Sequence, residues 1–317
     1  MNGLTIFSAP KPFSDMHIAM IQRNAILSWK QLGSAVEVIL IGEETGLAEF
    51  AREAGVRHIP TVRRNVDGTP LISDMLQIAR KEASFDQLCL INADIILLPG
   101  FVDTVSDIAQ TTKDYLVLGR RWDVEIREPL DFANGWNQNL KHGIQQTGKL
   151  HKSKGSDYFV FDKAQFQDMP DFAIGRAGWD NWTIYSARQN GLRVIDATHD
   201  ITIVHQQHDY SHLPGGIIHY TLPESDENLK LAGGKRHIFT LLDSNRLLVD
   251  GKVETIPLSW KKLIREFEIL PVLHSNNKFL MDLFFYITHP AKFLRHKLPG
   301  LAKILGIKKP IDREEDQ

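Results

Sequence analysis

Short apolar runs alternate with amphipathic segments along most of this chain. The uninterrupted apolar runs are typical of strands buried on both faces. They predict strands at residues 4–7, 36–41, 88–91, 115–118, 158–161, 193–195 and 201–204. Between them, apolar residues three or four apart predict helices at residues 14–32, 47–54, 70–79, from about 101, and at 181–190, the first capped by Ser14. This alternation predicts an α/β fold with a mainly parallel sheet flanked by helices.

The end of this alternating region is less regular. Residues 120–154 are polar, and we expect loop and helix that cover a site there. The last two predicted strands complete the expected core near residue 222. We therefore predict one domain over residues 1–222 and a largely helical C-terminal extension over residues 223–317.

The C-terminal extension combines basic and apolar residues. From Trp260 onward lysines and arginines alternate with apolar runs such as residues 279–281 and 283–287. A basic, aromatic-rich stretch of this kind can lie in the interface of an anionic membrane. A helix that packs on the core, or on a second copy of the chain in a homodimer, fits the same pattern, so the alternatives stay open.

Composition narrows the function classes. The chain has 317 residues, 43% hydrophobic and 24% charged, and a formal net charge of -2. These values are typical of a globular protein and argue against a nucleic-acid binder that works by overall charge. The single cysteine, Cys89, lies in an apolar strand, which excludes an intrachain disulfide and a cysteine-built zinc site. We expect no signal peptide and no spanning helix, and hence a cytoplasmic location.

One carboxylate follows the apolar strand at residues 88–91. Asp94 comes after Asn92 and Ala93, where the chain should leave the carboxyl edge of the sheet. Open α/β sheets bind their ligands at this edge. An aspartate there, two residues after an asparagine, can hold a divalent cation and so grip a diphosphate. It can equally cap the turn at residues 98–100, and the strand alone does not decide.

Two further clusters lie near predicted strand or helix ends. Residues 155–159, Gly-Ser-Asp-Tyr-Phe, place a polar turn before a strand, which a simple tight turn also explains. Residues 175–182 combine two glycines, two tryptophans and Asp180 at a helix start. Asp180 can be an N-cap beside core tryptophans. We favour a general base, because a helix start on a rigid sheet can hold a carboxylate close to the proton that it removes.

Three histidines follow the strand at residues 201–204, namely His205, His208 and His212. A single histidine is more often structural, but this cluster at a strand exit favours a metal or phosphate role. His205 should project from the same sheet edge as Asp94. Imidazole together with carboxylate oxygen suits Mn²⁺ better than Ca²⁺, and Mg²⁺ fits with additional waters.

Together these segments resemble the GT-A-fold glycosyltransferases, which use nucleotide-diphosphate sugars. Residues 92–94, Asn-Ala-Asp, look like the Asp-x-Asp metal motif of that superfamily with Asn in the first place. Asp180 falls where many inverting members carry a base, and His205 where many supply a histidine to the metal. The resemblance covers roughly residues 3–220. Residues 155–159, 178–182 and 205–216 also look like a poorly characterised group of glycosyltransferase-like proteins of bacteria and plants.

The resemblance implies a Rossmann-like GT-A fold with a C-terminal helical extension, and it implies roles for individual residues. Mn²⁺ or Mg²⁺ would be held by Asp94, Asn92 and His205. The donor would meet Phe7, Ser8, Ala9, Pro10, Glu43, Asp74, Arg80, Asn92, Ala93, Arg120 and Arg121. The acceptor or sugar pocket would contain Asp157, Trp179, Asn181, Trp182 and His208.

The implied activity is transfer of a sugar from a UDP-sugar, or second a GDP-sugar, to a hydroxyl of a glycan or lipid-linked acceptor. Asp180 would take the acceptor proton, and direct attack would invert the anomeric centre. Two alternatives stay open. One is a nucleotidyltransferase that makes the activated sugar, although residues 8–12 lack the glycines usual in such enzymes. The other is a non-catalytic binding module on a degenerate transferase scaffold, for which Asn92 is the best support.

Overall fold

The computed structural model describes residues 3–133, 135–207, 222–275 and 277–298. The chain divides into two compact units, Met1–Ile256 and Pro257–Gln317. The boundary lies beyond the expected one at residue 222, because two strands after that residue join the central sheet of the first unit. The helices expected from residue 223 are accordingly split between the two units.

The first unit alternates strands and helices, as the hydrophobic pattern predicts. Its elements in chain order are β1 (Leu4–Ser8), α1 (Met16–Lys30), β2 (Val36–Ile41), α2 (Leu47–Ala54), β3 (Arg57–Ile59), α3 (Ile72–Glu82), β4 (Gln87–Ile91), β5 (Ile95–Leu97), α4 (Phe101–Thr111), β6 (Tyr115–Leu118), β7 (Trp122–Val124), α5 (Trp136–Thr147), β8 (Lys149–Leu150), β9 (Tyr158–Asp162), α6 (Trp179–Gln189), β10 (Arg193–Asp196), β11 (Ile203–Gln206), α7 (Pro223–Leu231), η3 (Lys235–His237), η4 (Leu241–Asp243), β12 (Arg246–Val249) and β13 (Lys252–Thr255).

The central sheet has the strand order β13-β12-β10-β6-β9-β4-β1-β2-β3. Most neighbours are parallel, which confirms the predicted fold class. The exceptions are β13 at one edge and β9, which is antiparallel to both β4 and β6. Because β9 runs in the opposite direction, its first residues lie beside the carboxyl ends of β4 and β6.

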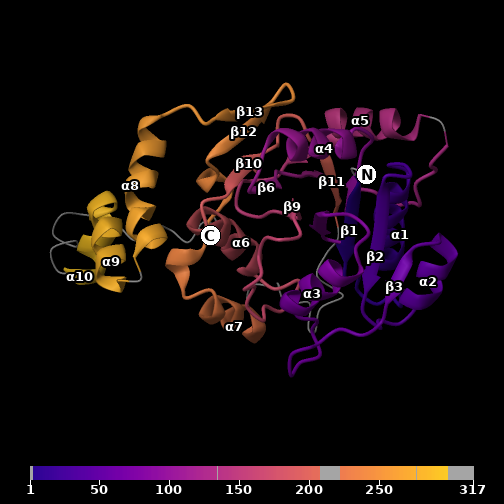
Figure 1. The fold of residues 1–317 in the computed structure, drawn as a ribbon, viewed down its shortest axis with the longest axis horizontal. Helices are drawn as coiled ribbons and strands as arrows, with labels where there is room; N and C mark the ends of the chain where they lie inside the picture. Colours follow the sequence, from indigo (N-terminus) through magenta and orange to yellow (C-terminus); the bar gives the residue numbers. More distant parts are fainter. Residues whose placement is uncertain (1–2, 134, 208–221, 276, 299–317) are drawn as a thin grey trace. The chain divides into compact units, whose positions relative to one another are not determined.

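Helices cover both faces of the central sheet, which explains why its strands are uninterrupted apolar runs. On one face α1, α2 and α4 supply side chains such as Trp29, Phe50 and Val105 to a buried cluster. On the other face the ring of Phe159 lies 5.1 Å from that of Trp179 in α6. Figure 1 shows α4 and α3 on opposite sides of β1 and β9.

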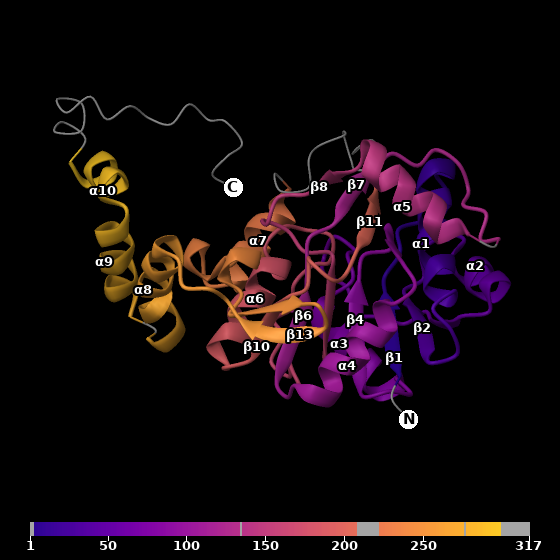
Figure 2. The ribbon, with the colours of Figure 1, turned by 90° about the horizontal axis from the view of Figure 1, so that it is seen from above.

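A smaller sheet with the order β5-β11-β7-β8 lies at the end of the central sheet away from the start of β1 (Figure 2). The apolar pattern predicts a core strand at residues 201–204. The strand instead spans Ile203–Gln206 and belongs to this smaller sheet. His205 is therefore inside a strand, opposite Ile95 of β5, and this pairing brings it next to the turn that contains Asp94.

Two helix starts matter for the site. The N-cap of α1 is Asp15, whose carboxylate accepts from the N–H of Ile18 at 2.9 Å, and not the predicted Ser14. Helix α6 begins at Trp179 after Gly178, whose φ of 103° is in the region that favours glycine. Asp180 thus lies in the first turn of α6, where the N–H groups point out of the helix.

The second unit contains α8 (Trp260–His274), α9 (Lys278–Thr288) and α10 (Pro290–Lys297). The rings of Phe267 and Phe284 stack between α8 and α9 with centroids 4.6 Å apart. Thr288 of α9 donates to the buried carboxylate of Glu268 in α8 at 3.3 Å. Within the residues that the structure describes, no helix is long and apolar enough to cross a membrane.

Candidate active site

The turn after β4 places Asp94 at the carboxyl edge of the central sheet. The backbone N–H of Asn92 donates to the carbonyl of Asp157 at 2.9 Å, which ties this turn to the start of β9. The buried amide of Gln206 donates to the carbonyl of Asp94 at 3.2 Å and accepts from Asn24 of α1 at 3.0 Å. Three neighbouring segments therefore fix the backbone around Asp94.

His205 lies between two aspartates. Its Nε2 is 3.8 Å from Oδ2 of Asp94, and its Nδ1 is 3.0 Å from Oδ1 of Asp123. A proton on Nδ1 that is shared with Asp123 leaves the Nε2 lone pair on the side of Asp94. Asp123 also accepts from Nδ1 of His151 at 2.8 Å. Burial raises the pKa of Asp123, but the bonds to His151 and His205 outweigh it and hold that pKa well below its usual range.

The guanidinium of Arg121 joins Asp123 to Asp157. Its Nε is 3.0 Å from Asp123, and one terminal nitrogen is 2.6 Å from Oδ1 of Asp157. Burial opposes this charge, but the carboxylates of Asp157, Asp123 and Asp94 raise the pKa of Arg121. The amide nitrogen of Asn92 donates to the same oxygen of Asp157 at 2.9 Å. Asn92, which stands in the first place of the segment that resembles an Asp-x-Asp motif, thus holds Asp157 in place.

Asp180 lies beside the loop that leads into β9. Its Oδ2 is 3.9 Å from the position that a Cβ would take at Gly155. Burial raises the pKa of Asp180 to about 6; the N–H groups of Asn181 and Ser156 lower it, and the negative charge of Asp157 raises it. A carboxyl group with a pKa near neutrality can take a proton at physiological pH and release it again. The structure thus brings a tuned carboxylate to the same loop as Asp157.

Several residues of this edge are not indicated as site residues by the sequence pattern, notably Lys11, Asp123, His151 and Arg176. Lys11 follows the predicted donor loop; burial lowers its pKa, the charge of Asp94 raises it, and the charge of Arg176 lowers it. Asp123 lies in β7, a strand of three residues within the stretch that we expected to be loop and helix. In the sequence, only the alternation of apolar and polar residues at Trp122, Asp123 and Val124 indicates this strand, and three residues are too few to distinguish a strand from a loop.

The predicted donor loop reaches this edge, but part of it is core. Phe7 and Ser8 are almost completely buried. The hydroxyl of Ser8 donates to the carbonyl of Ile91 at 2.6 Å, which fastens the end of β1 to the end of β4. Ala9 and Ala93 are half-buried and Pro10 is buried. These residues therefore shape the backbone of the edge and offer a ligand little side-chain surface.

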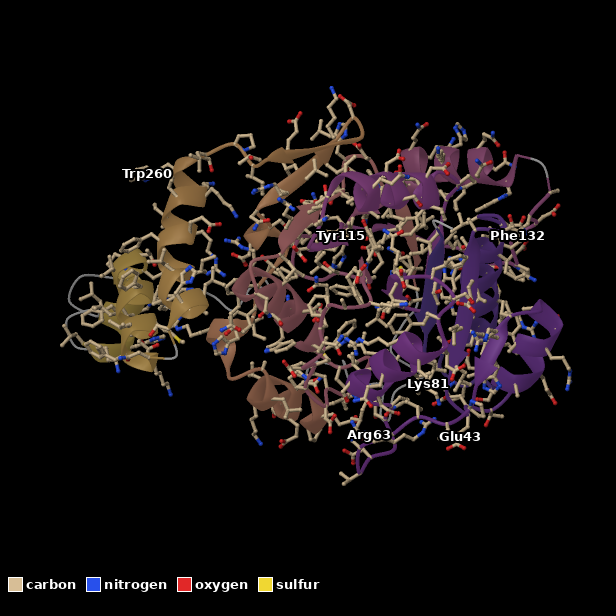
Figure 3. The ribbon with its side chains drawn as sticks, viewed as in Figure 1. Glu43, Arg63, Lys81, Tyr115, Phe132 and Trp260 are labelled. Carbon is tan, nitrogen blue, oxygen red and sulfur yellow. The ribbon has the colours of Figure 1, made fainter. Side chains whose placement is uncertain are left out.

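The acidic residues predicted near the nucleotide have different surroundings. Glu43 projects from the surface with 73% of its side chain exposed (Figure 3). Its neighbour Glu44 is held by Arg64 at 2.9 Å and is mostly buried. Asp74 accepts from the backbone N–H of Arg63 at 2.7 Å, so its carboxylate is used to fix the loop before α3.

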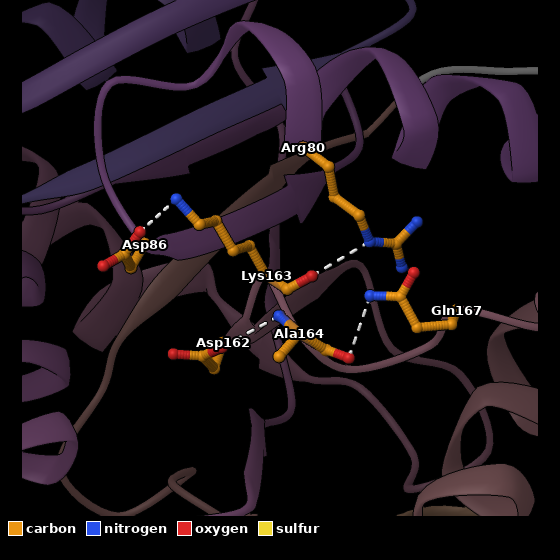
Figure 4. A pocket seen from close by; sticks show the side chains of 6 residues that line it. All are labelled: Arg80, Asp86, Asp162, Lys163, Ala164 and Gln167. Atoms are coloured by element: carbon orange, nitrogen blue, oxygen red, sulfur yellow. Dashed lines mark hydrogen bonds and ion pairs between the residues drawn. The ribbon is translucent and has the colours of Figure 1, made fainter.

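Arg80 lies at the opposite edge of the sheet. Its guanidinium donates to the carbonyls of Lys163, Gln165 and Phe166 just after β9. Figure 4 shows it at a pocket of about 400 Å³ with Asp86 and Asp162. The five residues of β4 separate this pocket from the turn with Asp94, roughly 17 Å at about 3.3 Å per residue. The structure therefore does not bring Arg80 to the carboxyl edge of the sheet that contains Asp94.

Arg120 supports the small sheet instead of facing a ligand. Its Nε donates to the carbonyl of His151 at 2.5 Å, and a terminal nitrogen donates to the carbonyl of Leu150 at 3.4 Å. These bonds hold the end of β8 and thereby the partner of Asp123. Of the two predicted arginines, only Arg121 lies among the carboxylates.

The predicted sugar-stacking residues are mainly core. Trp179 is 4% exposed and packs on Phe159, so neither face of its indole is open to a sugar ring. Trp182 is half-buried and contacts Phe172 at 5.2 Å between ring centroids. The amide of Asn181 donates to the carbonyls of Lys154 and Phe239. His208 lies outside the described residues.

The carboxylate oxygen of Asp94 and the imidazole nitrogen of His205 are placed so that both could ligate one divalent cation. Two ligands of one ion, each about 2.1 Å from it, can lie up to about 4.2 Å apart, and Asp94 and His205 are 3.8 Å apart. Carboxylate oxygen with imidazole nitrogen is a donor set that Mn²⁺ accepts. The hydrogen bond from His205 to Asp123 is the support that histidine ligands usually have.

A second group of side chains, His199, Asp200 and Asp250, could also hold a metal ion. Asp200 accepts from the backbone N–H groups of Asp250 and Gly251 at 3.2 and 2.7 Å, so it supports the turn between β12 and β13. Asp200 follows the end of β10, a strand three positions from β4 in the sheet order. At about 4.8 Å per strand this is on the order of 14 Å from the turn with Asp94, too far for the same ligand.

No family model and no curated protein matches the chain. Among solved structures, it is similar to a nucleotide-diphospho-sugar transferase of Desulfovibrio desulfuricans G20, with 14% identity, a TM-score of 0.41 and coverage of 62% of this chain and 80% of the other. It is also similar to GalNAc-T7 with UDP, GalNAc and Mn²⁺, with 12% identity, a TM-score of 0.46 and coverage of 73% and 48%.

A third similar structure is a mannosyltransferase from Pyrobaculum calidifontis in complex with GDP-Man and Mn²⁺. The identity is 14%, the TM-score is 0.43, and the match covers 97% of this chain and 81% of the other.

Proposed function

We propose that this chain is a metal-dependent glycosyltransferase that moves a sugar from a nucleotide-diphosphate sugar to an acceptor hydroxyl with inversion. One observation carries the proposal. Oδ2 of Asp94 and Nε2 of His205 lie 3.8 Å apart at the same edge of the sheet as Asp180, whose pKa burial raises to about 6. Asp157 links them, since it is bonded to Arg121 and Asn92 on one side and acts on the pKa of Asp180 on the other.

The proposed metal is Mn²⁺ or Mg²⁺, held by Asp94 and His205, with Asn92 acting on Asp157. When bound, it would supply a Lewis acid that offsets the charge of the departing nucleoside diphosphate. Asp123 would orient His205 through Nδ1. The cations of Arg121 and Lys11 would attract the anionic donor to the same edge.

Asp180 is proposed to take the proton from the acceptor hydroxyl. Its deprotonated form is the major one above about pH 6, and its position in the first turn of α6 holds it rigidly. Attack by the activated hydroxyl on the face opposite the leaving diphosphate inverts the anomeric centre. The proposed donor is a UDP-sugar or a GDP-sugar, and the proposed acceptor is a glycan or a lipid-linked sugar.

A donor-turnover assay tests the proposal. We expect transfer or slow hydrolysis of a nucleotide sugar with Mn²⁺, and loss of turnover in Asp94→Ala and Asp180→Asn. The matched control is His199→Ala, which removes a member of the other possible metal group and should leave turnover unchanged. Turnover at the wild-type rate in both site variants would contradict the proposal. A product with retained configuration would remove Asp180 as the base.

The proposed location is the cytoplasm, with contact to the inner face of the membrane through the C-terminal unit. A homodimer through the same unit is the competing explanation of its apolar surface.

A further inference from the structure

The helix α8 exposes an apolar stripe along its whole length. Its members recur every three or four residues, the spacing of one helix face. They are Trp260, Leu263, Ile264, Phe267 and Leu270. Trp260, at the first residue of the helix, is 76% exposed and is labelled in Figure 3. The buried residues Ile269, Val272 and Leu273 lie elsewhere on the helix surface, so α8 is apolar on two sides.

The helix α9 exposes a second stripe. Phe279, Leu280, Leu283 and Ile287 are exposed, and Phe279 is 72% exposed. The stacked rings of Phe267 and Phe284 join α8 to α9. The ion pair of Arg265 with Glu268 at 2.7 Å and the bond from Thr288 to Glu268 add polar contacts between and along the same helices. The two stripes thus belong to one folded helix pair.

Single exposed apolar residues are common on globular proteins, but a contiguous group marks an interaction site. The two stripes together contain nine large apolar side chains. We therefore expect the two exposed stripes of α8 and α9 to be covered by an apolar surface outside this helix pair.

The net charges of the two units indicate what covers the two stripes. Residues 257–298 contain seven lysines and arginines against three carboxylates, a net charge of +4. Residues 1–256 contain 26 against 32, a net charge of -6. Two copies of the helix pair placed face to face would bring like charges together. An anionic surface attracts the helix pair and repels the rest of the chain, which also sets the orientation.

We propose that α8 and α9 bind the surface of an anionic lipid bilayer, with the two apolar stripes in the interface and the lysines at the headgroups. The helices have 15 and 11 residues and lie in the interface plane. Trp260 has the amphipathic ring that is favoured at that depth. The binding surface does not depend on the proposed transferase chemistry, so each can fail without the other.

Cosedimentation of the full chain with vesicles tests the proposal. The probes are vesicles of phosphatidylcholine alone and of phosphatidylcholine mixed with phosphatidylserine. We expect binding to the mixed vesicles, weak binding to the neutral ones, and release at high salt.

Two double variants separate the apolar and the ionic contributions. Phe279→Ser with Ile287→Ser should weaken binding about tenfold or more, because each removes an apolar side chain from the interface. Lys261→Glu with Lys278→Glu should weaken binding at least about 25-fold, since each lysine near an anionic surface contributes about fivefold. All four side chains are exposed, so the fold should be unaffected.

Matched controls lie in the first unit. Val66 is 101% exposed, and the side chain of Lys81 is 82% exposed (Figure 3). Val66→Ser and Lys81→Glu should leave vesicle binding unchanged. Absence of binding to the mixed vesicles, or an equal loss in the control variants, would overturn the proposal. A dimer in solution that Phe279→Ser dissociates, with no vesicle binding, would assign the surface to a second copy of the chain.

Discussion

Replacement of Asp180 by asparagine should lower activity and, above about pH 6, raise stability. The side chain keeps its shape and loses its charge. The carboxyl has a pKa of about 6 in the folded chain against an ordinary value of 3.8, a difference of roughly two units. At about 1.4 kcal/mol per unit, the charged form costs the folded state up to about 3 kcal/mol.

The sign of this effect follows from the direction of the pKa shift. Below the ordinary value of 3.8 the group is protonated in both the folded and the unfolded chain, and it costs nothing. Above about pH 6 it is charged in both, and the folded chain bears the full cost of a buried charge beside Asp157. The wild type should therefore lose stability relative to Asp180→Asn between these two pH values.

Activity should move in the opposite direction. If Asp180 is the base, kcat/KM of the wild type rises about tenfold per pH unit up to about pH 6 and then levels. Asp180→Asn should reduce kcat by a factor of about 100 to 10,000, and the residual activity should lack the rise. Initial rates across this pH range with saturating Mn²⁺, and urea unfolding at the two ends of it, measure both effects.

Asp196 supplies the matched control. Burial also raises its pKa, and its carboxylate accepts from the N–H of Thr198 at 2.9 Å, but it lies at the end of β10. Asp196→Asn should change stability with pH in the same direction and leave the pH profile of activity unchanged. An Asp180→Asn enzyme with normal kcat would exclude Asp180 as the base, and a stability change that is the same at both ends of the pH range would exclude the raised pKa.

Four further outcomes are expected. Asp123→Ala should weaken Mn²⁺ binding about 10- to 100-fold in titration calorimetry, because His205 loses the partner of its Nδ1, whereas His199→Ala should not. Trp179→Ala should lower the free energy of unfolding by about 3 to 5 kcal/mol in urea, because the indole is core. Arg80→Ala should lower it by about 1 to 3 kcal/mol, because three carbonyls lose their donor, with an unchanged KM for the nucleotide sugar. Mn²⁺ should bind more tightly when a nucleoside diphosphate is present, which the same calorimetry measures.

Local pattern was sufficient to predict most of the first unit. The apolar runs are long enough to identify β1, β2, β4, β6 and β9, and the helices between them have clear apolar faces. The pattern could not predict that β12 and β13 join the sheet after residue 222, because β12 pairs with β10 across some 50 residues and β13 joins only through β12. It also placed the strand of His205 in the wrong sheet, since a short apolar strand does not specify its partner.

The ends of predicted strands and helices are the positions where a sequence pattern indicates candidate site residues. Asp94 follows the end of β4, Asp180 lies in the first turn of α6, and His205 directly follows the apolar run at residues 201–204, so the pattern marks all three as candidates. Trp179 was assigned to a sugar pocket because tryptophan beside an acidic residue has the same sequence signature whether it stacks on a ligand or fills the core. Asp123 was missed because its role comes from a hydrogen bond to His205, 82 residues away. A hydrogen bond between side chains so far apart in the sequence produces no periodic pattern that a single sequence could reveal.

The charges around Asp94 explain why the metal should need the donor. Arg121 is drawn to the carboxylates of Asp123 and Asp157, and Lys11 lies close enough to Asp94 for each to act on the other's charge. A divalent cation that enters alone is attracted by Asp94 but meets repulsion from Arg121 and Lys11. A nucleoside diphosphate that enters alone meets Asp94 and repulsion from its carboxylate. The cation and the diphosphate carry nearly opposite charges, so each reduces the repulsion that the other meets at the site. The diphosphate should therefore raise the affinity for the cation, and the cation should raise the affinity for the diphosphate by the same factor.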